Sequence, residues 1–182
     1  MKIYLAGPDV FHAEALEIAR RKKALCAAQG FEGLFPLDND IGAAADASKA
    51  EIAARIYDAN IAMLDRSDAV IANVTPFLGA GCDDGTAFEI GYAVARGLPI
   101  ALYDNGIGDT ASKGAVFVQD APSRADPKIE AEDFGLPVNL MLAIPALRRA
   151  PIATGDATLP MTDLSRFETA LSALHSSLGS AA

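Results

Sequence analysis

The run Asp68–Val74 constrains the fold more than any other feature of the chain. It is a nearly continuous apolar run with a polar residue at its start and another close to its end. Such a run is typical of a parallel strand at the centre of a sheet that helices cover on both faces. Short apolar runs also occur at residues 2–6, 31–36 and 99–103, and helical patterns separate them. We therefore predict a doubly wound, Rossmann or flavodoxin-like parallel sheet flanked by helices.

Apolar residues recur with helical spacing between and after these strands. The pattern predicts helices at residues 11–29, 49–65, 86–96, 139–149 and 162–178. We expect Ala115–Val118 to add a fifth strand inside a polar segment, residues 105–138, part of which would serve as a lid. The length suits one compact domain, so residues 1–182 are expected to form a single unit with a flexible tail at about 179–182.

The chain is acidic, with 15 lysines and arginines against 24 aspartates and glutamates and a formal net charge of −9. This balance argues against binding to nucleic acid or to an anionic membrane, because both depend on clustered cationic side chains. Cys26 and Cys82 do not have metal-ligand spacing, and no uncharged apolar run is long enough to span a bilayer. We expect a soluble cytoplasmic protein with free thiols, no metal and no cofactor.

The stretch Asp83–Gly91 is an acidic, glycine-containing turn that runs into an apolar helix carrying Glu89. Thr86–Glu89 has the sequence of a capping box, in which Thr86 would cap the helix and Glu89 would bond back to the amide of the cap. The same glutamate could carry chemistry, and a position on the first turn would let the helix dipole favour its ionised form. The local sequence is compatible with both interpretations.

In an open parallel sheet, ligands bind outside the carboxyl ends of the strands. The loops that follow the predicted strands at 7–11, 36–40 and 75–89 therefore converge on one crevice. The acidic residues on these loops are Asp9, Asp38, Asp83, Asp84 and Glu89. Without a histidine cluster, a basic phosphate clamp or a complete glycine fingerprint, they suit a neutral sugar better than a dinucleotide. Glycosidic-bond chemistry and a magnesium site would both use these side chains.

Five groups of residues occur in one order over roughly residues 1–145. They are Met1–Pro8, Phe35–Asp38, Asn60–Met63 with Asp68–Asn73, Gly85–Ala93 and Gly135–Met141. Together they resemble the nucleoside 2-deoxyribosyltransferases. The resemblance implies an enzyme that transfers the 2-deoxyribosyl group between the purine or pyrimidine bases of 2'-deoxynucleosides, with a nucleoside and a free nucleobase as substrates.

The resemblance also implies roles for individual residues. Glu89 would attack the anomeric carbon, release the base and hold a covalent deoxyribosyl ester until a second base takes the sugar. Tyr4 would orient Glu89, and Asp68 would take part in proton transfer. Asp83 would bind sugar hydroxyls. Asn139 and Met141 would reach across from a neighbouring subunit of a homo-oligomer, a dimer or larger. The remaining candidate substrate-binding residues are Gly7, Phe11 and Asp38, on the converging loops.

Two alternatives remain open from the sequence. Related hydrolases cleave deoxynucleoside 5'-monophosphates, but an aspartate at position 83 would repel a phosphate and so favours nucleosides. An N-glycosidase that uses water is therefore the second hypothesis, and a non-catalytic nucleotide- or sugar-binding module is the third. Structural roles are also possible for the site residues: Tyr4 could be a core aromatic, Asn139 a helix cap and Met141 a core filler.

Overall fold

Four parallel strands form the central sheet of the computed structural model, which describes residues 1–39, 41–42, 46–120 and 130–179. The strands are β1 (Lys2–Ala6), β2 (Glu32–Leu34), β3 (Ala69–Asn73) and β4 (Ile100–Tyr103), and their order is β2-β1-β3-β4. The order reverses between β1 and β3, so the carboxyl ends of these two strands mark the switch point where ligands bind in such sheets.

The alternation of side chains along β1 assigns each residue to one face of the sheet. Ile3 and Leu5 pack into the core on one face, whereas Tyr4 and Ala6 pack into the core on the other. Tyr4 lies opposite Val70 of β3 in the parallel register, and both residues are completely buried. The register thus fixes Tyr4 in the middle of the sheet.

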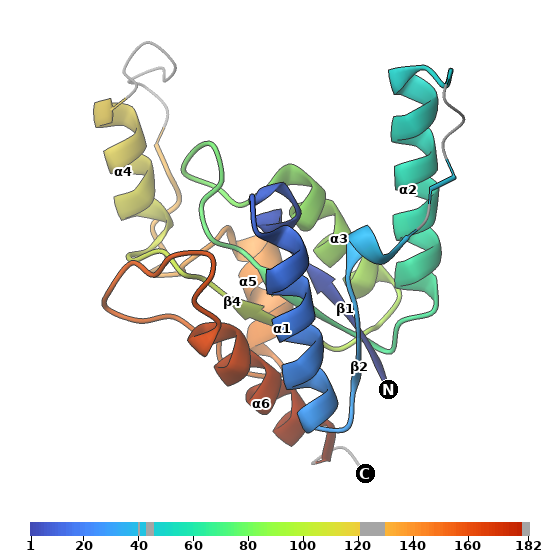
Figure 1. The fold of residues 1–182 in the computed structure, drawn as a ribbon. Coiled ribbons are helices and arrows are strands. Elements are labelled where there is room, and N and C mark those ends of the chain that lie inside the picture. Colours follow the sequence, from blue (N-terminus) through green and yellow to red (C-terminus); the bar gives the residue numbers. More distant parts are fainter. Residues whose placement is uncertain (40, 43–45, 121–129, 180–182) are drawn as a thin grey trace.

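Helices cover both faces, as the sequence predicts (Figure 1). On one face α1 (Ala15–Ala28) and α6 (Ser165–Gly179) bury Ile18 and Phe167 against the sheet. On the other face α3 (Asp84–Ala95) and α5 (Leu140–Leu147) bury Ile90 and Ala143. The doubly wound α/β architecture is therefore confirmed.

Two short 3-10 turns follow the neighbouring strands β1 and β2. The turn η1 (Pro8–Phe11) follows β1, and η2 (Pro36–Asp38) follows β2. Because η1 takes up these residues, α1 begins at Ala15, four residues later than expected. Both turns lie at the carboxyl edge of the sheet and supply walls of the cavity described below.

Two helices project from the body, α2 (Lys49–Asp65) and α4 (Thr110–Asp120) (Figure 1). Ser48 caps α2 in a reciprocal capping box with Glu51. Only Met63 and Leu64, at the end of α2, are buried. A helix of this length is only marginally stable without packing, so most of α2 offers a surface for another contact.

The prediction of a fifth strand at Ala115–Val118 is wrong, because these residues belong to α4. The side chain of Asp109 accepts a hydrogen bond from the Ser112 amide at 2.8 Å, which satisfies a donor of the first helical turn. This local cap outweighs the strand propensity of Val116 and Val118. In the described part of the chain the sheet has four strands, and Ala153 adds a single parallel bridge to Tyr103 at its edge.

Candidate active site

Tyr4 and Glu89 form the centre of the candidate site. Tyr4 points from β1 toward α3, and its hydroxyl group donates a hydrogen bond to Oε1 of Glu89. Tyr4 is completely buried and Glu89 is partly buried. Tyr4 of the sheet therefore fixes the position of one carboxylate oxygen of Glu89 on helix α3.

Burial changes the pKa values of both groups. Desolvation raises the pKa of Glu89 to about 7, against the lowering effect of the Tyr4 hydrogen bond, and the charge of Asp83 raises it further. Desolvation first and the charge of Glu89 second raise the pKa of Tyr4 above its ordinary value. Near neutral pH Tyr4 therefore stays a neutral donor, while Glu89 exchanges a proton readily.

A cavity of about 340 Å³ opens beside Glu89. Its walls come from the segments after β1 and β2, from α2 and from the start of α3. The lining residues are Gly7, Val10, Phe11, Pro36, Leu37, Asn39, Ile41, Ile56, Ala59, Asn60, Asp83, Gly85, Thr86 and Glu89. The volume falls in the range of about 300 to 1,000 Å³ that small-molecule sites occupy. The structure thus brings Gly7, Phe11 and Asp83 to Glu89.

Asp83 caps α3. Its Oδ2 accepts hydrogen bonds from the backbone amide of Thr86 at 2.8 Å and from the Thr86 hydroxyl at 3.0 Å. The expected capping box of Thr86 and Glu89 is therefore wrong: the helix begins at Asp84, and Glu89 lies on its second turn, bonded to Tyr4. The expectation that the helix dipole favours ionised Glu89 also fails, because burial dominates and raises the pKa.

Two predicted site residues lie elsewhere. Asp68 is exposed at the amino end of β3, where its Oδ2 accepts a hydrogen bond from the backbone amide of Lys2 at 2.7 Å. Asp38 forms an ion pair with Lys23 at 2.6 Å and accepts the Phe35 amide at 2.9 Å. Neither carboxylate lines the cavity beside Glu89. Ligands in such sheets bind at the carboxyl edge, so the position of Asp68 separates it from the site.

A family model described as nucleoside 2-deoxyribosyltransferase matches residues 3–141. The chain belongs to the nucleoside 2-deoxyribosyltransferase family. The match covers the four strands, except for Lys2 at the start of β1, as well as Tyr4, Asp83 and Glu89. The family resemblance seen in the sequence is thereby confirmed.

The chain is also similar to individual proteins, one of which is a solved 2-desoxiribosyltransferase. The structure of a 2-desoxiribosyltransferase from Leishmania mexicana is 30% identical, with a TM-score of 0.65 over 96% of this chain and 97% of that one. An uncharacterized protein of Schizosaccharomyces pombe is 37% identical over 100 residues, which are 54% of this chain and 47% of the relative. The match thus spans about half the length of that curated relative. A conserved protein from Enterococcus faecalis, 22% identical over 94% of this chain and 97% of that one, shares the fold with a TM-score of 0.52.

In this nucleoside 2-deoxyribosyltransferase family member, Asn139 and Met141 lie away from the cavity of their own chain. Asn139 caps α5 by accepting the Met141 amide at 3.0 Å, and its amide group donates to Glu132 at 2.9 Å. It lines a different cavity, together with Cys82 and Ala87 on α3 and the loop before it. Met141 is 72% exposed. Both residues are therefore placed on a surface that a neighbouring molecule could reach.

Two amide side chains of the cavity were not expected from the sequence as site residues. Asn39 donates to the Pro36 carbonyl oxygen at 3.2 Å and to Oδ1 of Asn60 at 3.4 Å. Both line the cavity opposite α3. Asn60 comes one helical turn after Ile56 on α2. A polar amide beside the apolar stripe of this helix is the sequence signal that could have identified Asn60 as a site residue. Asn39 follows a turn and carries no comparable signal.

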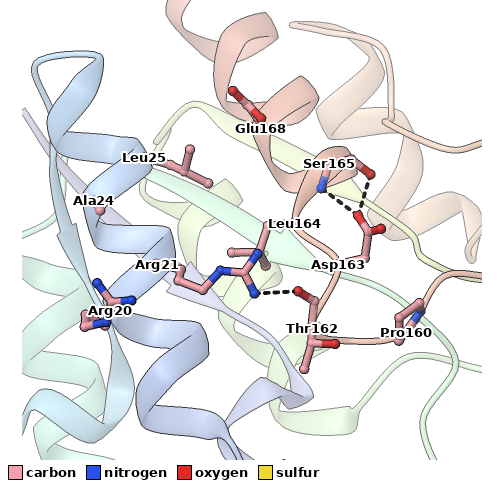
Figure 2. A pocket seen from close by; sticks show the side chains of 10 residues that line it. All are labelled: Arg20, Arg21, Ala24, Leu25, Pro160, Thr162, Asp163, Leu164, Ser165 and Glu168. Atoms are coloured by element: carbon pink, nitrogen blue, oxygen red, sulfur yellow. Dashed lines mark hydrogen bonds between the residues drawn. The ribbon is translucent and has the colours of Figure 1, made fainter.

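A second cavity, of about 670 Å³, lies between α1 and the segment that leads into α6 (Figure 2). Several of its polar groups already bond to one another: Arg21 donates to the Thr162 carbonyl oxygen at 2.8 Å, and Asp163 accepts from Ser165 at 2.6 Å and 2.9 Å. Glu89 and Tyr4 do not line it. Size alone therefore does not make it the candidate site, since chemistry needs available polar groups.

The cysteines offer no second nucleophile. Burial raises the pKa of both Cys26 and Cys82 to about 11, so their thiols stay protonated at neutral pH. No group of three histidine, cysteine, aspartate or glutamate side chains in the described residues could hold a metal ion. Within the same part of the chain, no helix has the length and hydropathy needed to cross a membrane.

Proposed function

We propose that this chain transfers the 2-deoxyribosyl group between nucleobases through a covalent ester on Glu89. One observation carries the proposal: a carboxylate with a pKa of about 7, held by the buried Tyr4 hydroxyl, lines a small cavity with Asp83. Membership of the nucleoside 2-deoxyribosyltransferase family supports the same activity.

In the first half-reaction, Oε2 of Glu89 attacks the anomeric carbon of a 2'-deoxynucleoside. The new carbon–oxygen bond forms as the glycosidic carbon–nitrogen bond breaks, and the base leaves with the electron pair and takes up a proton. Tyr4 bonds to Oε1, so it orients Oε2 and stabilises charge on the carboxylate. An oxocarbenium-like transition state forms readily because a 2-deoxy sugar lacks an electron-withdrawing hydroxyl group.

In the second half-reaction, a nitrogen of another base attacks the same carbon. The ester bond breaks, its electron pair returns to Glu89, and the incoming base loses a proton. Asp83 accepts a hydrogen bond from a sugar hydroxyl in both halves. Its position in the cavity and its Oδ1 atom, the oxygen that does not receive the Thr86 bonds, support this role.

Water competes with the second base, so the intermediate must be shielded. We assign this to a homo-oligomer in which Asn139 and Met141 close the site of a neighbouring subunit. Their location outside the cavity of their own chain supports the assignment, as does the exposure of Met141. The projecting helix α2, with Tyr57 56% exposed and Ile56 43% exposed beside the cavity, adds an apolar face that a second copy would cover.

Incubation with deoxyinosine and free adenine tests the proposal. Transfer produces deoxyadenosine together with hypoxanthine, whereas an N-glycosidase produces hypoxanthine and free deoxyribose. Conversion of neither substrate would favour a binding module and contradict both enzymatic activities. Glu89→Ala serves as the matched control, and inosine in place of deoxyinosine tests the requirement for a 2-deoxy sugar. Mass spectrometry of quenched enzyme should detect a deoxyribosyl adduct on the peptide that contains Glu89.

A further inference from the structure

A fully buried ion pair lies directly beneath the candidate site. Nζ of Lys22, on α1, is 2.8 Å from Oδ2 of Asp9, and the two side chains are 1% and 0% exposed. The side-chain amide of Asn73, also completely buried, donates to both oxygens of Asp9 at 3.3 Å. Nζ of Lys22 also lies 5.3 Å from the ring centroids of Tyr103 and Phe167.

The pair connects the loop that forms one wall of the cavity to the loop that leads to Asp83. Asp9 belongs to η1, whose neighbours Gly7, Val10 and Phe11 line the cavity. Asn73 ends β3 and begins the loop that leads to Asp83. Through this contact, α1 holds the cavity-lining loop directly, and it holds the loop that leads to Asp83 by way of Asn73.

The connection continues along the second loop. Oδ1 of Asn73 accepts the Thr75 amide at 3.1 Å and the Thr75 hydroxyl at 2.5 Å. Oγ1 of Thr75 in turn accepts the backbone amide of Asn105, after β4, at 2.8 Å. On the outer side, the rings of Phe11 and Phe77 stack with centroids 5.1 Å apart, so the loops meet again. The two loops are therefore linked at two places, by the buried contact between Asp9 and Asn73 and by the stacked rings of Phe11 and Phe77.

Gly7 shows how closely the first loop approaches this cluster. Its φ is 150°, and a Cβ atom there would lie 2.5 Å from Oδ2 of Asp9 and 2.7 Å from Cβ of Asn73. Any side chain at position 7 would therefore displace either the ion pair or the end of β3. The backbone that lines the cavity is in contact with the pair itself.

A buried ion pair seldom adds net stability, because the cost of removing two charges from water offsets their attraction. Such a pair can instead fix a unique arrangement of the parts that it joins. We propose that the Lys22–Asp9 pair is a positioning device that fixes the cavity-lining loop 7–11 relative to loop 74–78, which leads to Asp83. This inference rests on the proposed transferase function, since loop 7–11 and Asp83 line the cavity assigned to the substrate of that reaction.

The test replaces both charges with side chains of similar shape, in the double variant Asp9→Asn/Lys22→Met. Tyr4 and Glu89 are anchored independently, in β1 and α3, so their chemistry should persist. We expect KM for the deoxynucleoside to rise about tenfold or more while kcat stays within about threefold, as misplaced binding groups weaken substrate positioning. Glu17→Gln/Arg20→Met, which removes an exposed ion pair from the same helix, should leave both constants unchanged.

Hydrogen exchange provides a readout that does not depend on activity. Amides of residues 7–12 and 74–78 should exchange faster in the double variant than in the wild-type protein, with the strands β1 and β3 protected as before. Should the double variant fail to fold, Thr75→Val removes the link between Asn73 and Asn105 without touching the charges, and it should raise KM in the same direction.

Three results would overturn the inference: a folded double variant with wild-type KM and wild-type exchange, a fall in kcat with KM unchanged, or equal effects from the Glu17/Arg20 control. An inactive wild-type protein would instead refute the proposed function, and the exchange experiment would still decide whether the pair anchors the loops.

Discussion

Tyr4 in β1 donates a hydrogen bond from its hydroxyl group to Oε1 of Glu89, 85 residues further along the chain on α3. The carboxylate that we propose as the nucleophile is therefore subject to two opposing effects on its pKa. Burial raises the pKa of Glu89 and the Tyr4 hydrogen bond lowers it, and the balance leaves that pKa at about 7. A nucleophile must be ionised to attack, so the rate should follow this balance.

Replacement of Tyr4 by phenylalanine removes the influence that lowers the pKa of Glu89. The pKa should then rise above about 7, and the limb on which kcat/KM increases with pH should move to higher pH. At pH 7 we expect kcat/KM to fall about ten- to a hundredfold, from lost carboxylate and lost orientation. The measurement is kcat/KM from pH 5 to 9. A Tyr4→Phe enzyme with the wild-type limb would show that the hydroxyl does not tune Glu89.

Replacement of Glu89 by glutamine should stabilise the fold at alkaline pH. The folded pKa of Glu89, about 7, exceeds its ordinary value of 4.5. Between these values the folded protein keeps a proton that the unfolded chain loses, so this group's contribution to stability falls as pH rises. The cost is complete above pH 7 and amounts to roughly 2–3 kcal/mol.

Urea unfolding at pH 4.5 and pH 8 measures the effect. Glu89→Gln should gain stability over the wild-type protein at pH 8 but little at pH 4.5, while turnover is abolished at both. Glu168→Gln, at an exposed position on α6, is the matched control and should show no such pH-dependent difference. An equal gain at the two pH values would contradict a raised pKa.

The strands β1, β3 and β4 could be predicted because each contains a compact apolar run, and β3 is buried at every position. The strand wrongly expected at Ala115–Val118 failed for a local reason, since Asp109 starts a helix there. The projection of α2 also escaped prediction. Its apolar stripe indicates burial, but sequence alone does not distinguish packing within the chain from packing against another molecule.

Part of the lining of the candidate cavity could be predicted from the position of residues on the loops that follow the strands. Gly7, Phe11 and Asp83 follow strands or precede α3, and they line the cavity with Glu89. Asp38 follows a strand as well, but its carboxylate turns to Lys23, a partner that the sequence does not reveal. The helix was predicted to begin two residues late, at Thr86 instead of Asp84, because its cap is Asp83, whose side chain accepts the Thr86 amide, and not Thr86.

Asp83 has two separable roles, as a helix cap and as a substrate ligand. Asp83→Ala should lose both, with a stability loss of about 1 kcal/mol from the missing cap. Asp83→Ser keeps a capping oxygen for the Thr86 amide but removes the carboxylate, so its melting temperature should stay near the wild-type value. KM for the deoxynucleoside should rise in both variants. Wild-type KM in Asp83→Ser would mean that Asp83 only caps α3.

Asp68 should be dispensable for turnover, despite the role that the family resemblance implies. Its carboxylate is exposed and bonds the Lys2 amide at the amino end of the sheet. Asp68→Asn keeps an oxygen that can accept this bond, so we expect kcat/KM within about threefold of wild type, against a loss of at least about a thousandfold for Glu89→Ala. A loss in Asp68→Asn comparable to that in Glu89→Ala would require Asp68 to reach the substrate in the working enzyme.

Subunit mixing tests whether Asn139 acts across an interface. Asn139 and Glu89 line different cavities of one chain, so a shared site would combine Glu89 of one subunit with Asn139 of another. When inactive Glu89→Ala subunits exchange with Asn139→Ala subunits, half of the dimers are hybrids and each hybrid has one complete site. Activity should therefore recover to about one quarter of the wild-type value. Subunits with distinct tags verify the exchange by native mass spectrometry, and mixing Glu89→Ala with the Glu89→Ala/Asn139→Ala double variant is the control that should stay inactive. If proven hybrids remain as weak as their parents, Asn139 does not complete a neighbour's site, and the exposed surface of α5 has another purpose.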